Sequence, residues 1–272
     1  MSNTTTQSVP LSLPGRVALI TGGSRGIGAA TVRLFCQAGA RVAFSYRAAV
    51  AQASALASEC NTLSGYDQSC IPIRQPLDTL EDGHALVGAT VRAFGRLDCL
   101  IVNHGVWPSH DQPIAAMSAQ QWRTTLGINL DSVFGLVQSA VAQMQQQPAI
   151  EVNTRGHIVL VASTAAQRGE AFHADYAASK GALISLTKSL SSELAPQGIL
   201  ANCVAPGWVR TDMSAAAFEH PETSKKVLAT IPLGRAARPE EIAGPILFLC
   251  TPLAGFISGE IFNVNGGAVL VG

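Results

Sequence analysis

The chain has 272 residues, of which 47% are hydrophobic and only 13% are charged, and its formal net charge is zero. This length allows one large α/β domain or two small ones, and the apolar content is ample for a sizeable core. A neutral chain without a basic run is a poor partner for nucleic acid or for an anionic membrane. The polar N-terminal residues indicate no secretory signal, and no apolar stretch is long enough to span a bilayer, so we expect a cytoplasmic protein.

The low charge content also bears on assembly. Soluble domains usually carry about 25% charged residues, so this chain has fewer charged residues than a fully solvent-exposed surface of a monomer usually carries. We therefore expect part of that surface to be buried between subunits. An alanine-rich monomer is the alternative.

Six cysteines and six histidines are scattered along the chain. None of the cysteines falls in a CxxC or Cys/His spacing, so we predict no metal site and expect reduced, buried thiols. A bridge between Cys60 and Cys70 across a loop is the alternative.

Apolar segments alternate with helical segments along most of the chain. Residues 1–13 are expected to form a flexible tail, and residues 14–272 one domain, because no linker or repeat divides them. The expected strands are 16–21, 41–46, 69–73, 97–103, 156–163, 199–206 and 259–267. The expected helices lie at about 25–38, 49–63, 79–94, 118–147, 174–195, 212–230 and 239–250. This alternation predicts an α/β fold with a doubly wound, Rossmann-type parallel sheet of about seven strands and helices on both faces.

The stretch TGGSRGIG, residues 21–28, follows the first expected strand and opens a helix. Glycines in this context allow a tight turn, close approach of the backbone to a pyrophosphate, and close packing of helix on strand. The N–H groups at the helix start favour phosphate as well. We predict a dinucleotide site here, with a plain glycine turn as the alternative; its loop residues are Gly22, Ser24, Arg25, Gly26, Ile27 and Gly28.

The end of the second expected strand bears on which dinucleotide binds. An acidic residue there would hold the ribose 2′-hydroxyl of NAD, but the strand ends in Tyr46 and Arg47. Arg47 and Arg25 offer two guanidinium groups for a 2′-phosphate. The pattern favours NADP(H) over NAD(H), unless Arg47 is a solvated surface arginine.

Tyr176 and Lys180 are four residues apart on an expected helix, so they share one face. A neighbouring ammonium favours the phenolate and is expected to lower the pKa of Tyr176, making it a candidate proton donor or acceptor. Ser163 ends an expected strand, where ligands bind in doubly wound sheets. Asn129 is an unusual amide within a long helical stretch.

Taken together, these residues resemble the short-chain dehydrogenase/reductase family over residues 14–272. TGGSRGIG matches the family's TGxxxGxG loop, and Ser163, Tyr176 and Lys180 match its catalytic serine, tyrosine and lysine, with Asn129 at its helix asparagine. Further matches to cofactor-contacting positions are Asp78, Asn103, Gly105, Pro206, Gly207, Val209 and Thr211. Two departures are His104, where alanine is usual, and a long loop at 145–156.

The resemblance implies a hydride transfer between a nicotinamide and a carbonyl carbon. Tyr176 would donate the proton, Ser163 would hydrogen-bond the carbonyl oxygen, and Lys180 would bind the nicotinamide ribose. Asn129 would hold a water that relays protons through Lys180. The family also implies a homotetramer with 222 symmetry.

The substrate is less clearly marked. Four apolar residues fall in loops expected to rim the pocket and suggest an apolar or aromatic ketone, although plain loop packing explains them equally: Trp107, Phe172, Trp208 and Met213. The C-terminal third resembles the 3-oxoacyl-(acyl-carrier-protein) reductase branch, whose acidic carrier calls for basic residues on the long helices. Gly135 and Ser192 stand where such bases are expected, with Arg123 and Arg168 as possible substitutes. We therefore rank a general carbonyl reductase or secondary alcohol dehydrogenase first, the acyl-carrier reductase second, and an NAD-dependent sugar or polyol dehydrogenase third.

Overall fold

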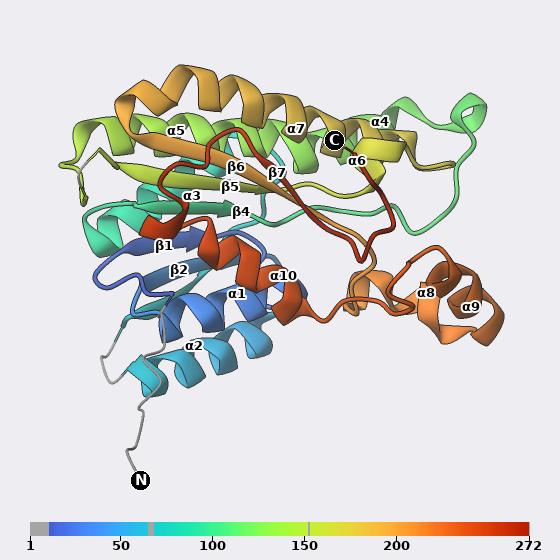
Figure 1. The fold of residues 1–272 in the computed structure, drawn as a ribbon, viewed down its shortest axis with the longest axis horizontal. Coiled ribbons are helices and arrows are strands. Elements are labelled where there is room, and N and C mark those ends of the chain that lie inside the picture. Colours follow the sequence, from blue (N-terminus) through green and yellow to red (C-terminus); the bar gives the residue numbers. More distant parts are fainter. Residues whose placement is uncertain (1–10, 65–67, 152, 272) are drawn as a thin grey trace, which may run out of the picture.

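A single parallel sheet of seven strands organises the protein (Figure 1). The computed structural model describes residues 11–64, 68–151 and 153–271. The strand order is β3-β2-β1-β4-β5-β6-β7, with all neighbours parallel. The strands are β1 Val17–Ile20, β2 Arg41–Tyr46, β3 Cys70–Arg74, β4 Cys99–Val102, β5 Gly156–Val161, β6 Ile199–Pro206 and β7 Ile261–Val264. The predicted fold class is confirmed.

Helices cover both faces of this sheet. On one face lie α1 Gly26–Gln37, α2 Val50–Ser64 and α10 Pro239–Phe248. On the other lie α3 Leu80–Phe94, α5 Ser132–Gln146 and α7 Ala174–Leu194. Shorter helices are α4 Ala119–Leu126, α6 Ala165–Arg168, α8 Ala215–Glu219 and α9 Pro221–Ala229. In Figure 1, α8 and α9 (orange) project beyond the sheet rather than covering it.

The core follows from the strand sequences. β1 and β4 are continuous apolar runs, and β5 is apolar except for His157; all three are buried along their whole length, as strands covered on both faces must be. Their side chains point alternately into two apolar clusters, one under each helical layer.

Local signals fix the helix ends. Thr79 and Asp82 form a capping box at the start of α3, and Gly95 ends that helix with a φ of 80°.

Three sequence expectations differ from the structure. The helix expected over 118–147 is interrupted by a π-turn at Gly127–Asp131, which separates α4 from α5. The helix expected over 212–230 is broken into α8 and α9, because Pro221 favours the first turn of a new helix. Residues 1–10 of the expected tail lie outside the described residues, but Leu13 is fully buried in the core and its backbone N–H donates to Ala38.

The strand order places a topological switch at β1 and β4. The chain leaves β1 for β2 on one side, and returns to β4 on the other side after β3. Ligands of doubly wound sheets bind outside the carboxyl ends of the strands at this point. The loops that follow β1, β2 and β4 therefore define the expected cofactor crevice.

Candidate active site

The glycine loop leaves no room for larger residues. Gly22 and Gly26 have φ values of +63° and +54°, which favour glycine. A Cβ on Gly28 would lie 2.1 Å from the carbonyl oxygen of Gly22. The side-chain amide of Asn103 donates to the carbonyl oxygens of Thr21 and Gly22, at 3.0 and 3.3 Å. No side chain caps the start of α1, so its first N–H groups remain free to receive an anion.

The end of β2 carries a cluster of charges. Arg47 Nη1 lies 2.7 Å from a carboxylate oxygen of Asp78, and both side chains are partly exposed. Arg74, at the end of the neighbouring strand β3, donates to the Arg47 carbonyl at 3.4 Å. Arg25 lies 3.3 Å from Asp212 instead, across the glycine loop. Arg74, which sequence reasoning missed, therefore adds a guanidinium group next to the backbone of Arg47. The pairing of β2 with β3, which sets Tyr46 beside Arg74, is the signal that could have found it.

Ser163, Tyr176 and Lys180 meet at the carboxyl end of β5. Ser163 follows the strand by two residues, and a hydrogen bond joins it to the Tyr176 side chain. Lys180 lies one turn further along α7 and donates from Nζ to the carbonyl oxygen of Val161 at 2.8 Å. Tyr176 and Lys180 are only 8% and 4% exposed. The three predicted catalytic side chains therefore share one site, in which Tyr176 and Lys180 are buried and Ser163 is half-buried.

Burial controls the ionisation of this site. It raises the pKa of Tyr176 to about 12, and the hydrogen bond with Ser163 acts in the opposite direction. It also lowers the pKa of Lys180 to about 8. The predicted lowering of the Tyr176 pKa is therefore wrong for the chain alone, because desolvation of the phenolate outweighs the hydrogen bond with Ser163.

Asn129 is fully buried within the π-turn. Its Oδ1 accepts from the backbone N–H of Val106 at 2.8 Å, and its Nδ2 donates to the Val106 carbonyl at 3.0 Å and to Ser179 at 3.1 Å. π-turns often mark functional positions in helices. Here the turn aims an amide at the segment after β4 and at α7, so Asn129 ties these two parts of the site together.

His104 is half-buried beside the glycine loop. Its Nδ1 lies 2.8 Å from Thr21 Oγ1, and its Nε2 lies 2.8 Å from Ser132 Oγ and 3.1 Å from the carbonyl oxygen of Ile128. Burial lowers its pKa to about 3, so the ring is neutral at physiological pH. The sequence marked His104 only as a departure from the family pattern, whereas the structure makes it a link between β1 and the π-turn.

Of the four predicted substrate residues, which all lie in the described part of the chain, Trp107 alone has a ring contact with Tyr176. Its ring centroid lies 4.7 Å from that of Tyr176 and 4.0 Å from that of His173. Phe172 is 52% exposed with a strained φ of 65°. Trp208 packs against Phe218 of α8, with ring centroids 6.0 Å apart, and Met213 is exposed on the same excursion from the sheet.

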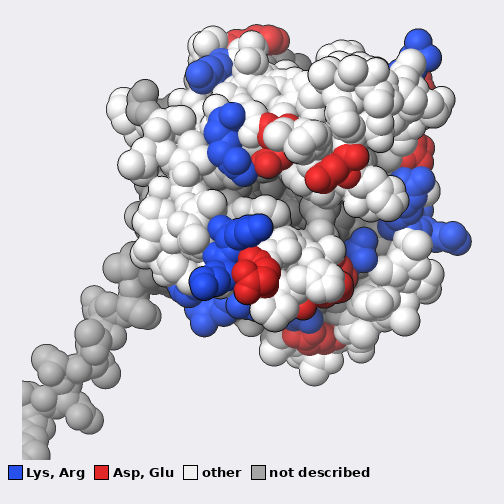
Figure 2. All heavy atoms as spheres, turned by 90° about the vertical axis from the view of Figure 1, so that its right-hand side faces the viewer, with Lys and Arg blue, Asp and Glu red and all other residues white. Residues whose placement is uncertain are grey.

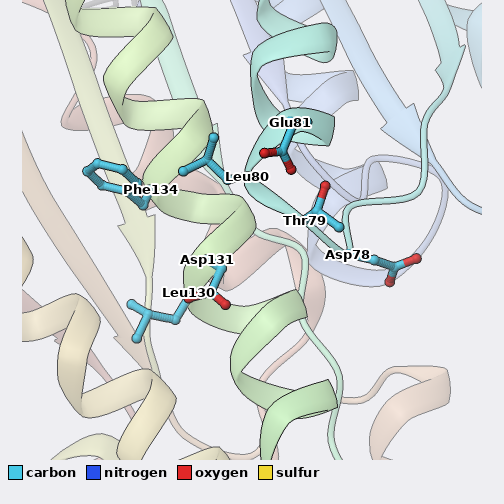
Figure 3. Close-up of a pocket in the computed structure, with 7 residues that line it drawn as sticks. All are labelled: Asp78, Thr79, Leu80, Glu81, Leu130, Asp131 and Phe134. Atoms are coloured by element: carbon cyan, nitrogen blue, oxygen red, sulfur yellow. The ribbon is translucent and has the colours of Figure 1, made fainter.

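Two surface hollows are lined by other residues than Tyr176. One, of about 430 Å³, lies between the start of α3 and α5 and carries three carboxylates, those of Asp78, Glu81 and Asp131 (Figure 3). The other, of about 450 Å³, extends from the glycine loop to the start of α10. On the face at the carboxyl end of the sheet, basic and acidic side chains are interspersed, and no patch of one sign dominates (Figure 2).

The remaining cofactor positions also reach this edge of the sheet. Pro206 ends β6, Gly207 donates to the Val264 carbonyl, and Val209 is buried in a bridge to Ala237. Thr211 begins the short turn that leads to α8.

None of the helices in the described part of the chain has the length and apolar character needed to span a membrane.

The cysteines contain a feature that sequence spacing concealed. All six are free thiols, so the alternative of a Cys60–Cys70 bridge is wrong. The Sγ atoms of Cys36, Cys60 and Cys70 lie within 4.8 Å of one another. They come from α1, α2 and β3, and separations of 24 and 10 residues resemble no metal motif.

Comparison with known proteins settles the family. A family model described as enoyl-(acyl carrier protein) reductase matches residues 22–269. A 3-oxoacyl-(acyl-carrier-protein) reductase of Synechocystis is 34% identical over 95% of this chain and 99% of its own length. A short chain dehydrogenase from Burkholderia cenocepacia, solved in complex with NADP, superimposes with a TM-score of 0.84 at 30% identity, over 94% of this chain and 98% of that chain. The chain belongs to the short-chain dehydrogenase/reductase family.

Members of this family differ in their substrates. An L-rhamnose 1-dehydrogenase (NAD(P)(+)) of Azotobacter vinelandii is 32% identical over 93% of this chain and 96% of its own length. A 3-oxoacyl thioester reductase and a sugar dehydrogenase thus resemble this chain about equally. Membership establishes an oxidoreductase and leaves the substrate to be argued from the site.

Proposed function

We propose that this protein is an NADP(H)-dependent carbonyl reductase, which also oxidises secondary alcohols in the reverse direction. The observation that carries the proposal is the buried meeting of Ser163, Tyr176 and Lys180 beside the glycine loop. One potential proton donor, one hydroxyl and one ammonium converge at the point where the sheet places its ligands.

The residues present fit a nicotinamide dinucleotide. Gly22 and Gly28 let the loop pack tightly on itself, since a Cβ on Gly28 would collide with the Gly22 carbonyl oxygen. The first N–H groups of α1, which no side chain caps, are available to a phosphate. The 2′-phosphate would lie against Arg47 and Arg74, where β2 ends without a carboxylate. This cationic end supports NADP(H) over NAD(H), and the Burkholderia relative was solved with NADP.

Bound NADPH supplies the hydride for the carbonyl carbon. Tyr176 holds its proton through neutral pH, because burial raises its pKa, and donates that proton to the developing alkoxide. Ser163 hydrogen-bonds the same oxygen and orients the carbonyl. Lys180, fixed by Val161, holds ribose hydroxyls and passes protons toward Tyr176. Asn129 hydrogen-bonds to Ser179 and to Val106, and so holds α7, which carries Tyr176 and Lys180, in place against the segment after β4.

The second candidate is a 3-oxoacyl-(acyl-carrier-protein) reductase, which the relatives' names favour. The charge pattern argues against it. Gly135 is buried, and a Cβ there would lie 2.1 Å from the Leu80 carbonyl oxygen, so that position cannot present a base. Arg168 is paired with Glu170 at 2.6 Å, which leaves Arg123 as the remaining substitute for an acidic carrier. We therefore place small carbonyl compounds first.

The test is a parallel assay of NADPH oxidation with an acetoacetyl thioester, an aryl methyl ketone and a simple 3-oxo ester. Tyr176→Phe is the blank. Faster reaction of the free ketone and ester supports the carbonyl reductase. A strong preference for the thioester would make the acyl-carrier reductase the better answer. Reduction of NAD⁺ by a sugar alcohol, with no activity on ketones, would contradict both.

We also propose that the protein is a homotetramer. Large apolar side chains are exposed on α4 and α5 and near the C-terminus, which supports buried subunit surface: Trp122, Phe134, Phe256 and Leu270. Light scattering is expected to give about four times the chain mass of 28.3 kDa. A mass equal to one chain would overturn this proposal.

A further inference from the structure

Three cysteines from separate elements meet at the edge of the sheet opposite the active site. Cys36 lies in the last turn of α1, Cys60 near the end of α2, and Cys70 is the first residue of β3. All three side chains are almost completely buried, at 4%, 0% and 1% exposure. Their Sγ atoms lie within 4.8 Å of one another. This cysteine triad is not part of the cofactor or catalytic site.

The spacing of the sulfur atoms suits one shared ion. Metal–thiolate bonds of about 2.3 Å in a planar three-coordinate site place the sulfurs about 4 Å apart. Sulfurs at this upper limit of 4.8 Å would need to move inward by about 0.5 Å each, and closer sulfurs by less. Such shifts are within the reach of side-chain rotation, and no backbone rearrangement is required.

The donor set selects the kind of ion. Thiolates are soft ligands that prefer Cu(I), zinc or iron–sulfur clusters. Structural zinc needs four ligands, and among the described residues no fourth Cys, His, Asp or Glu completes the group. The surroundings are apolar, with all three cysteines inside the core cluster under α1 and α2.

We propose that Cys36, Cys60 and Cys70 form a binding site for a single Cu(I) ion. Binding forms three copper–sulfur bonds and releases the three thiol protons to solvent. Copper remains in the Cu(I) state and no electron is transferred. The site is independent of the proposed reductase activity, since Tyr176 lies beyond the opposite, carboxyl end of the strands.

The experiment uses the full reduced chain under anaerobic conditions. Cu(I), kept reduced by ascorbate, is titrated against the chelator bathocuproine disulfonate, and bound copper is counted per chain. X-ray absorption of the loaded wild-type protein gives the number of sulfur neighbours. The variants Cys36→Ala, Cys60→Ala and Cys70→Ala are compared with Cys250→Ala, a matched control that removes an equally buried thiol elsewhere.

One copper per chain with three sulfur neighbours is the expected result. Each triad variant should weaken binding by at least about tenfold, while Cys250→Ala should not. The proposal would be overturned by two sulfur neighbours, by the absence of tight copper binding, or by copper binding that is lost in Cys250→Ala. The triad would then contribute only to the packing of the core. The X-ray absorption measurement needs no variant, so it decides the matter even if a triad variant fails to fold.

Discussion

The imidazole Nδ1 of His104 lies 2.8 Å from the hydroxyl oxygen of Thr21, which joins the segment after β4 to the segment after β1. The other ring nitrogen reaches Ser132 at the start of α5. A Cβ on Gly22 would lie only 3.1 Å from the Cα of His104, so this link also backs the cofactor loop. His104 is therefore a positioning residue between the cofactor loop and the π-turn that carries Asn129.

His104→Ala is expected to lower the free energy of unfolding by about 1–3 kcal/mol, because buried hydroxyls lose a hydrogen-bond partner. It should also raise KM for NADPH more than KM for the ketone, since the cofactor loop loses its support. Urea denaturation and steady-state kinetics measure the two effects. His84→Ala, which removes one surface contact to Gln138, is the control. Equal effects of the two variants would contradict the assigned role.

Acid should destabilise the protein through its buried histidines. Burial lowers the pKa of His157 to about 4 and that of His104 to about 3, from an ordinary 6.5. Below pH 6.5 the unfolded chain binds protons that the folded chain excludes, so stability falls as pH falls toward these values and is unaffected above 6.5. Each histidine contributes up to about 1.4 kcal/mol per pH unit.

His157→Leu removes the contribution of one of these two histidines. The free energy of unfolding should therefore decrease less steeply as the pH falls below 6.5. Urea denaturation at neutral and mildly acidic pH measures the slope. The exposed His220 provides the matched variant His220→Gln, which should keep the wild-type slope. A slope unchanged by His157→Leu would mean that other groups govern acid unfolding.

The two directions of the reaction should depend differently on pH. Burial raises the pKa of Tyr176 to about 12, so the residue stays a proton donor throughout the neutral range. Ketone reduction should therefore change little around neutrality, whereas alcohol oxidation, which needs the phenolate as base, should rise with pH. Initial rates in both directions across neutral and alkaline pH test this. An oxidation rate independent of pH would argue against Tyr176 as the base.

Tyr176→Phe should lower kcat by about 10²–10⁴-fold in both directions, because the proton donor is lost. Binding of NADPH, followed by its fluorescence, should persist in this variant, since the glycine loop and Arg47 are untouched. Loss of binding together with activity would point to a folding defect instead.

Arg47→Ser should raise KM for NADPH by about 10–100-fold, because charge-assisted contacts of about 1.5–3 kcal/mol are lost. KM for NADH should stay nearly constant, since NADH lacks the 2′-phosphate. Arg92→Ser, which removes an equal charge from the exposed surface of α3, should change neither value. If both cofactors weakened equally, Arg47 would have no part in discriminating between them.

Gly28→Ala should abolish cofactor binding, because the new methyl group would lie 2.1 Å from the Gly22 carbonyl oxygen. Gly244→Ala is the matched substitution, since a Cβ at Gly244 meets nothing within 4 Å. On helix α10 it should stabilise the fold by about 0.5–1 kcal/mol. Thermal unfolding and NADPH titration of both variants give the comparison.

The sequence predicted those features that depend on local chain geometry. The glycine loop could be predicted because the close approach of two backbone segments requires glycine. The pairing of Tyr176 with Lys180 could be predicted because helical periodicity places them on one face. The alternation of short apolar segments with helical segments was enough to predict the sheet, because short apolar segments in this pattern are typical of buried strands.

The features it missed depend on contacts between distant segments. Arg74 reaches Arg47 through strand pairing, and the cysteine triad forms because α1, α2 and β3 pack together. The direction of the Tyr176 pKa shift depends on total burial, which no short motif reveals. The π-turn was missed because residues 118–147 keep a helical composition throughout.

The excursion between β6 and α10 has an evolutionary consequence. In Figure 1, α8 and α9 project beyond the layered body, while α7, which carries Tyr176, and α1, which follows the glycine loop, belong to it. No side chain of α8 or α9 is buried, so sequence changes in these two helices leave the packing of the sheet untouched. Chimeras that exchange residues 212–230 between relatives are thus expected to change the substrate preference while the core and the proposed catalytic residues stay the same.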